Sequence, residues 1–255
     1  MDRFNNTLGA PRRCMSSWSS IQDTMYLNLL AKTAFDAVTL DMQHGMQTED
    51  SVIRGITAIA PTGKPVIVRI PVGRFNFASK ALDAGAHGII APMINTVDDA
   101  REFVSFTKYV TTGARSYGPT QAVAVLGAAT PSDYVRRADE CTKTFAMIET
   151  KQAVDNMEAI LDVNGIDAVF CGPADLSLSI TGDLLPDAFG ESTIGIIEDM
   201  VKAAHDRGKL AGTFCVTPDT AEIANSVGFD FIAMAFDASY LSKGIDPMLD
   251  ALSFR

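Results

Sequence analysis

The sequence has few residues of several kinds, and each scarcity excludes a class of protein. Its four cysteines lie far apart and form no CxxC pair, which argues against a disulfide framework and predicts buried free thiols. No apolar run approaches the roughly 20 residues that a membrane span requires. Residues 1–17 have no apolar core of signal-peptide length. We therefore expect a cytoplasmic protein that does not bind a membrane.

Positive charge is scarce as well. The chain has 21 lysines and arginines against 31 aspartates and glutamates, so its formal net charge is −10. A chain of this charge without an obvious basic cluster is not expected to bind nucleic acid. The sequence also lacks a GxGxxG turn, a phosphate-binding P-loop and a Ser-His-Asp arrangement recognisable by motif. We expect the partner to be a small molecule.

Short apolar runs recur along the chain and predict its fold. The 255 residues are 47% hydrophobic, which is enough for a sizeable core. The runs are continuous, as in parallel strands covered on both faces, and helical spacing fills most of the gaps between them. The predicted strands are residues 13–19, 35–41, 65–70, 88–94, 144–149, 167–172, 210–215 and 231–236. They predict a single-domain (β/α)8 barrel over residues 1–255, with an open doubly wound sheet as the alternative.

Two segments interrupt this alternation of strands and helices. Residues 111–131 are rich in glycine, alanine and threonine, and residues 184–192 form a second irregular stretch. We interpret both as long functional loops or insertions.

Acidic side chains follow two neighbouring predicted strands, where the carboxyl ends of a parallel barrel carry its chemistry. Glu149 ends the fifth strand and Asp175 follows the sixth. Two oxygen ligands with room for water suit Mg²⁺ or Mn²⁺. The alternatives are that Asp175 caps the helix that begins at Leu176 and that Glu149 pairs with Lys151. Because both acids belong to one rim, we favour the metal site.

An arginine and a histidine follow two other strands at the same rim. Arg69 closes a buried strand and must meet a negative partner, which is Asp41, Glu149 or a substrate oxygen that gains charge during a reaction. Of three histidines only His44 is placed just beyond a strand end, and an imidazole suits proton transfer near neutral pH. The alternative for His44 is a structural role in a hydrogen bond to Asp41.

The turn between the sixth strand and the next helix is a candidate anion site. Gly172, Pro173 and Ala174 precede Asp175 there. Backbone N–H groups and the helix dipole at such a turn favour a carboxylate. An ordinary strand-to-helix turn is the alternative.

Seven stretches, in this order, resemble the HpcH/HpaI family of metal-dependent class II pyruvate aldolases, in the phosphoenolpyruvate and pyruvate barrel superfamily. They cover nearly the whole chain and read SSW, LDMQHG, VRIP, LDAGAHGIIAPMI, GARSYGP, MIET and GIDAVFCGPADLSLSITGD. The last two are the most specific. The resemblance implies an aldolase that cleaves 4-hydroxy-2-oxo acids to pyruvate and an aldehyde, or joins them in the reverse reaction.

By matching position, the resemblance also implies roles for single residues. Glu149 and Asp175 would bind Mg²⁺, Mn²⁺ or Co²⁺, which pyruvate would chelate, and Arg69 would hold the developing enolate oxygen. His44 would act as the base, oriented by Asp41 or Asp83. The substrate would lie against Trp18, Gly172, Ala174 and Phe214. The Asp83 position reaches a neighbouring subunit's site in the family, which implies a trimer or hexamer.

The chain departs from the family pattern at two positions beside the site. Many members have glutamate where Gln43 stands and glutamine where Met147 stands. These departures leave substrate choice and rate open. Two other functions are alternatives: an acyl-CoA lyase of the malyl- or citramalyl-CoA type, which needs a basic surface not obvious here, and a non-catalytic barrel that binds an oxo acid. The complete set of catalytic residue types argues against the latter.

Overall fold

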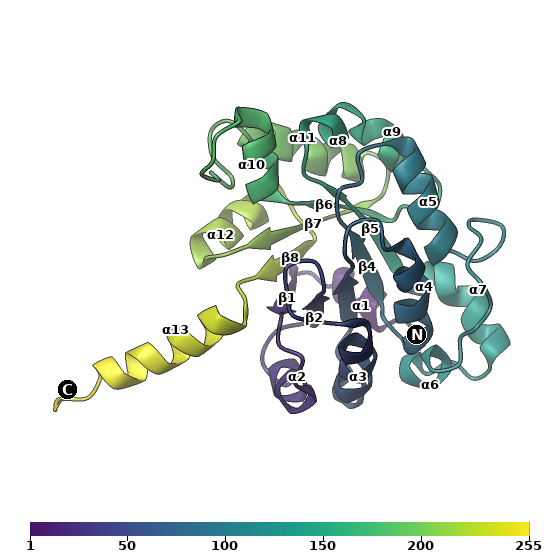
Figure 1. Cartoon of the computed structure of the whole chain (residues 1–255), viewed down its shortest axis with the longest axis horizontal. Helices are drawn as coiled ribbons and strands as arrows, with labels where there is room; N and C mark the ends of the chain where they lie inside the picture. Colours follow the sequence, from purple (N-terminus) through teal and green to yellow (C-terminus); the bar gives the residue numbers. More distant parts are fainter. Residues whose placement is uncertain (255) are drawn as a thin grey trace.

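Eight parallel strands form a closed barrel in chain order, and β8 pairs back to β1 (Figure 1). The computed structural model describes residues 1–254. The strands are β1 (Cys14–Ser19), β2 (Ala37–Asp41), β3 (Val66–Arg69), β4 (Gly88–Ala91), β5 (Lys143–Ile148), β6 (Ala168–Cys171), β7 (Leu210–Cys215) and β8 (Phe231–Met234). The predicted (β/α)8 barrel is confirmed, and the alternative of an open sheet is wrong.

Helices alternate with the strands and most of them surround the barrel, whereas α13 projects away from it (Figure 1). They are α1 (Arg3–Leu8), α2 (Thr24–Ala31), α3 (Glu49–Ile59), the 3-10 turn η1 (Ala60–Thr62), α4 (Phe75–Ala84), α5 (Val97–Thr107), α6 (Ala122–Leu126), α7 (Pro131–Cys141), α8 (Lys151–Asp155), α9 (Met157–Leu161), α10 (Pro173–Thr181), α11 (Ile194–His205), α12 (Pro218–Val227) and α13 (Asp237–Asp250). Threonine capping boxes begin three of them, at Thr48, Thr96 and Thr217. No helix in residues 1–254 combines the length and the apolar character needed to cross a bilayer.

The observed strands agree with the predicted ones to within two residues at each end, except that the fourth ends three residues early. The fourth was expected to reach residue 94, but β4 ends at Ala91 because Pro92 has no N–H for the ladder. The eighth was expected to reach residue 236, but Ala235 takes a positive φ of 58° and leaves the strand after Met234. These early ends release loop residues toward the centre of the barrel mouth.

The barrel is filled by a layer of apolar side chains. Phe145, Phe170 and Phe231 meet inside it, with ring centres between 5.5 and 6.4 Å apart. Phe4 of α1 is fully buried and packs 6.1 Å from Phe231, so α1 closes the amino-terminal end. A second and larger core lies between the strands and the outer helices. The interior is therefore solid, and open space for a ligand is left at the ends.

The two predicted loops lie at opposite ends of the barrel. Residues 111–131 precede β5 and include α6, so they lie at the amino-terminal end, away from the strand ends that carry chemistry. Residues 184–192 connect α10 to α11 at the carboxyl end. Only the second loop is placed to touch a substrate at that end.

Candidate active site

A cavity of about 390 Å³ lies at the carboxyl ends of the strands. It brings together eight of the ten residues that the sequence predicts for the site; Glu149 and Asp83 do not line it. The eight are Trp18, Asp41, His44, Arg69, Gly172, Ala174, Asp175 and Phe214. Most of the predicted rim therefore belongs to one enclosed space at the expected end of the barrel.

Alternation along the strands explains why these side chains point inward. Along β5, Phe145 and Met147 belong to the interior cluster, and Glu149 is the next position with the same parity. Along β3, Ile67 is interior and Arg69 follows it two residues later. The polar residues are thus the last inward-facing layer of a barrel whose lower layers are apolar.

Arg69 and Asp41 form a buried ion pair at the base of the cavity. Arg69 Nε lies 2.8 Å from Asp41 Oδ1, and Nη2 lies 2.7 Å from Oδ2. Trp18 Nε1 donates to Oδ2 at 3.3 Å, and the indole ring lies 4.7 Å beneath the guanidinium. Burial opposes ionisation of Asp41, but Arg69 outweighs it and lowers the pKa of the carboxyl. Of the partners considered for Arg69, the structure places Asp41 beside it.

His44 lines the cavity from the loop after β2 and is exposed. Its backbone N lies 3.5 Å from Asp41 Oδ1, but its imidazole has no hydrogen-bond partner within residues 1–254. The Asp41 oxygens already accept from Arg69, Trp18 and the backbone N–H of Gln43. Asp41 therefore orients Arg69, and no hydrogen bond within residues 1–254 fixes the imidazole as a structural group.

Glu149 lies just behind the cavity wall and is only 2% exposed. Its Oε1 accepts a hydrogen bond of 2.8 Å from the backbone N–H of Met93. Burial raises the pKa of Glu149 to about 7; the Met93 bond and Arg69 oppose the rise, while the charge of Asp175 adds to it. Met93 has a φ of 56°, a strained conformation for a residue with a side chain. The β4–α5 loop thus accepts strain while it holds this carboxylate.

Gly172 separates Glu149 from the cavity and leaves room for it. A Cβ atom at Gly172 would stand 2.6 Å from Glu149 Oε2 and 2.7 Å from Met147 Cε. No side chain fits at that distance, so only glycine lets the β6–α10 turn pass over the carboxylate. Met147 also lines the cavity. It presents a thioether where the family resemblance implies the amide of a glutamine.

Neither structural alternative for the two acids is seen. The N-cap of α10 is Gly172, and Asp175 lies within the first helical turn with its side chain at the cavity. Lys151, the alternative partner of Glu149, forms an ion pair with Asp155 at 3.3 Å. Both carboxylates therefore lack a basic side-chain partner among the described residues.

The donor set fits a divalent cation that keeps water or substrate ligands. Residues 1–254 contain no group of three or more His, Cys, Asp or Glu side chains arranged to hold a metal ion. Two carboxylates that repel one another, one of them buried, are stabilised by a positive ion between them. Mg²⁺ and similar ions commonly use one or two carboxylates and fill their other positions with water or substrate. Glu149 and Asp175 supply carboxylate ligands of that kind.

Asp83 lies outside the cavity, near the end of α4. It forms an ion pair of 2.5 Å with Arg115, whose side chain is fully buried between Tyr109 and Tyr134. Burial raises the pKa of Asp83, and Arg115 opposes the rise. Within one chain Asp83 does not meet His44. The role implied for it in a neighbouring subunit's site stays a prediction.

Three large apolar residues of the cavity were missed by the sequence analysis. Val216 continues the inward series of β7 two residues beyond Phe214, a signal that the alternation rule could have supplied. Phe236 follows β8, and Phe189 reaches the cavity from the α10–α11 loop. No local pattern identifies the last two, because their placement depends on how the chain folds back.

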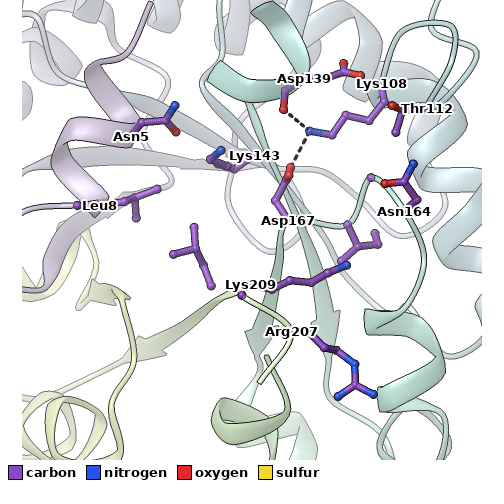
Figure 2. A pocket seen from close by; sticks show the side chains of 15 residues that line it. Asn5, Leu8, Lys108, Thr112, Asp139, Lys143, Asn164, Asp167, Arg207 and Lys209 are labelled. Atoms are coloured by element: carbon purple, nitrogen blue, oxygen red, sulfur yellow. Dashed lines mark hydrogen bonds and ion pairs between the residues drawn. The ribbon is translucent and has the colours of Figure 1, made fainter. Parts of the chain in front are cut away.

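A second cavity of about 580 Å³ lies at the opposite, amino-terminal end and is lined by lysines (Figure 2). Lys108 donates to Asp167 at 2.7 Å and to the carbonyls of Asp139 and Thr142 at 3.1 Å. Lys143 donates to the Glu140 carbonyl at 2.8 Å. These ammonium groups bind carbonyl oxygens at the carboxyl end of α7, where the helix dipole favours cations. The cavity contains none of the predicted site residues.

Comparison with known proteins agrees with this geometry. The model of the HpcH/HpaI aldolase/citrate lyase family matches residues 15–243. The hydroxypyruvate/pyruvate aldolase of Rhizorhabdus wittichii is 36% identical, covering 95% of each chain. The 2-keto-3-deoxy-L-rhamnonate aldolase of Shigella dysenteriae is 32% identical, covering 91% of this chain and 86% of its own. A solved HpcH/HpaI aldolase/citrate lyase family protein from Burkholderia cenocepacia has the same fold, with a TM-score of 0.85 at 24% identity over 98% of each chain. The chain belongs to the HpcH/HpaI aldolase/citrate lyase family.

Proposed function

We propose that this protein is a divalent-metal-dependent aldolase that joins pyruvate, or a related 2-oxo acid, to an aldehyde and cleaves the resulting 4-hydroxy-2-oxo acid. Both relatives named above are aldolases, so the predicted class of enzyme is confirmed. One observation carries the proposal for this site: the Arg69–Asp41 pair and the acids Glu149 and Asp175 meet at one end of the barrel.

Glu149 and Asp175 are the residues that would hold the metal. A bound divalent cation polarises the 2-oxo group of the substrate. We propose Mg²⁺, Mn²⁺ or Co²⁺, because two carboxylates with water suit such ions.

Arg69 supplies fixed positive charge where the substrate oxygen becomes negative. Its guanidinium is held by both oxygens of Asp41 and by the face of Trp18, so it needs no rearrangement during the reaction. The first turn of α10 receives the substrate carboxylate. Backbone N–H groups at Ala174 and Asp175 have no acceptor within that turn, and the helix dipole favours an anion there.

His44 is the proposed base. In the addition, a C3–H bond of pyruvate breaks, the proton goes to the imidazole, and the electron pair stays on the resulting enolate. The enolate C3 then forms a bond to the aldehyde carbon while the π bond of the aldehyde carbonyl breaks, and the aldehyde oxygen takes the proton back from the imidazolium. Cleavage runs these steps backwards. The free imidazole at the cavity supports this role.

Metal removal tests the proposal. After dialysis against a chelator, we expect the release of pyruvate from a 4-hydroxy-2-oxo acid to fall by about 100-fold or more, which corresponds to ~2.7 kcal/mol of lost stabilisation. Added Mn²⁺ should restore it. Circular dichroism before and after dialysis controls for unfolding. Unchanged turnover in protein that is shown by metal analysis to contain no metal would contradict the mechanism.

The two alternative functions receive less support from the cavity. Coenzyme A carries several phosphates, and the only basic side chains among the described lining residues are Arg69 and His44, of which Arg69 is already paired. A non-catalytic binding barrel needs no base, yet His44 stands unpartnered at the cavity.

We also propose that the protein is a homo-oligomer, a trimer or a hexamer. Helix α13 projects away from the barrel (Figure 1), and three large apolar side chains on it are exposed: Leu241, Ile245 and Met248. They are spaced four and three residues apart, so they share one face of the helix. An apolar face on a projecting helix is best covered by another copy of the chain.

A further inference from the structure

The side chains around the active-site cavity divide into two groups. The charged arc contains Asp41 and His44 from β2 and its loop, Arg69 of β3, and Asp175 after β6. The apolar arc runs from the α10–α11 loop through β7 and β8 to β1. It consists of Phe189, Phe214, Val216, Phe236 and Trp18. Because the barrel closes in chain order, the two arcs are adjoining parts of one mouth, and they meet where Trp18 contacts Arg69 and Asp41.

The apolar arc offers surface that an apolar ligand would cover. Val216 is 49% exposed and Phe236 is 40% exposed, although both line the cavity. Phe189 is nearly buried and has a φ of 63°, a left-handed conformation that a residue with a side chain rarely takes. Such strain persists where the surroundings impose it and is concentrated at functional sites. The α10–α11 loop accepts this strain while it places a phenyl ring at the cavity.

The same arc has no cation for a negatively charged substrate. Among the described residues that line the cavity, Arg69 and His44 are the only basic ones, and both belong to the charged arc. Arg69 is already bonded through two nitrogens to Asp41. A carboxylate or phosphate lying against phenyl rings and Val216 would lose water without gaining a positively charged partner. An alkyl or aryl group would lose only unfavourable contact with water.

We propose that the aldehyde substrate carries an uncharged, apolar chain and that Phe189, Val216 and Phe236 select it. This inference rests on the proposed aldolase function, since it assigns the charged arc to the 2-oxo acid and the apolar arc to the second substrate. It names a class of aldehyde and excludes phosphorylated and carboxylated ones.

A series of aldehydes tests the inference in the direction of addition, with pyruvate and Mn²⁺ present. From propanal to hexanal, kcat/KM should rise about three- to fourfold for each added methylene that the apolar arc buries. Pentanal should exceed 4-oxobutanoate, which is of similar length but anionic, by at least about 10-fold. Equal or better use of 4-oxobutanoate by the unaltered protein would overturn the inference.

Two variants assign the effect to the apolar arc. Val216→Lys places a cation at a half-exposed position and should raise kcat/KM for 4-oxobutanoate by about 10-fold while lowering it for hexanal. The matched control is Val110→Lys, because Val110 is 83% exposed and lies outside this cavity. Phe236→Ala should flatten the rise along the alkyl series. If both variants keep the wild-type preference, these residues do not select the aldehyde.

A reaction that needs no aldehyde distinguishes failure of this inference from failure of the proposed aldolase function. Exchange of the pyruvate methyl protons with deuterium, followed by NMR, reports C3 deprotonation alone. Exchange that is present in the wild type and in Val216→Lys, together with the predicted preference, supports the inference. Exchange with a preference for anionic aldehydes overturns only the inference, whereas absence of metal-dependent exchange overturns the aldolase proposal and this inference with it.

Discussion

The ion-pair partner of Arg69 is determined by the register of the neighbouring strand. The sequence predicts that it needs a negative partner but leaves three candidates. In the parallel register of β2 and β3, Asp41 and Arg69 are directly opposite one another, and this pairing selects Asp41. Register is a property of two strands together, so one strand read alone could not identify the partner.

Glu149 gives a prediction in which pH changes stability. Burial raises its pKa to about 7 in the folded metal-free chain, against an ordinary value of 4.5. The folded state therefore holds its proton more tightly than the unfolded state. This contribution to stability is complete below pH 4.5 and is lost as pH rises through 7. At pH 8, metal-free Glu149→Gln should be more stable than wild type by roughly 3 kcal/mol.

Urea unfolding of chelator-treated protein at pH 4.5 and pH 8 measures this difference. The variant and the wild type should be similar at pH 4.5 and diverge at pH 8. Glu102→Gln, at an exposed position of α5, serves as the control and should leave both values unchanged. Identical unfolding of wild type and Glu149→Gln at pH 8 would contradict the burial argument.

At the scale of helices and strands, much of the fold could be predicted from the sequence. All eight predicted strands exist, because continuous apolar runs have few other uses in a chain of this length. The errors fall at strand ends, where Pro92 and the positive φ of Ala235 end the pairing. Residues 111–131, interpreted as a functional loop or an insertion, lie at the amino-terminal end of the barrel, where α6 packs near α4.

Lys108 gives a prediction about how helix ends are stabilised. Its fully buried ammonium joins the end of α7 to Asp167 at the start of the β6 region (Figure 2). Lys108→Met removes a charge and leaves Asp167 and two carbonyls without this donor, so we expect a loss of about 3 kcal/mol. The matched control is Lys202→Met, because Lys202 forms an exposed pair with Asp206 one turn away.

Urea or thermal unfolding measures both variants against the wild type. Lys202→Met should leave the free energy of unfolding nearly unchanged. Equal stability of the two variants would contradict the argument. It would mean that the Asp167 carboxylate is solvated in the amino-terminal cavity without the Lys108 ammonium.

At the scale of the whole molecule, the sequence predicts the location of the site better than it predicts the full set of residues that line the cavity. Residues just after strands were found because strand ends of a parallel barrel converge. Phe189 and Phe236 were not, because a loop after α10 and the start of α13 reach the cavity only once the barrel closes. The cytoplasmic location and the role of Asp83 in a neighbouring subunit's site stay predictions.

Helix α13 gives the prediction about assembly. Leu241→Asp together with Ile245→Asp places charge on its apolar face and should lower the molar mass from that of an oligomer toward 27.3 kDa. Size-exclusion chromatography with light scattering measures the mass. Ser242→Asp together with Lys243→Asp alters charge on the same helix without removing large apolar side chains and should keep the oligomer. A wild-type protein that is itself monomeric would refute the proposal.

The split of the barrel mouth into a charged and an apolar side has an evolutionary consequence. Under the proposed function, mutations on β7, β8 and the α10–α11 loop would change which aldehyde is accepted and would leave the charged arc of Asp41, His44, Arg69 and Asp175 in place. Under the proposed function, related enzymes with this barrel could change their aldehyde preference and still form the enolate.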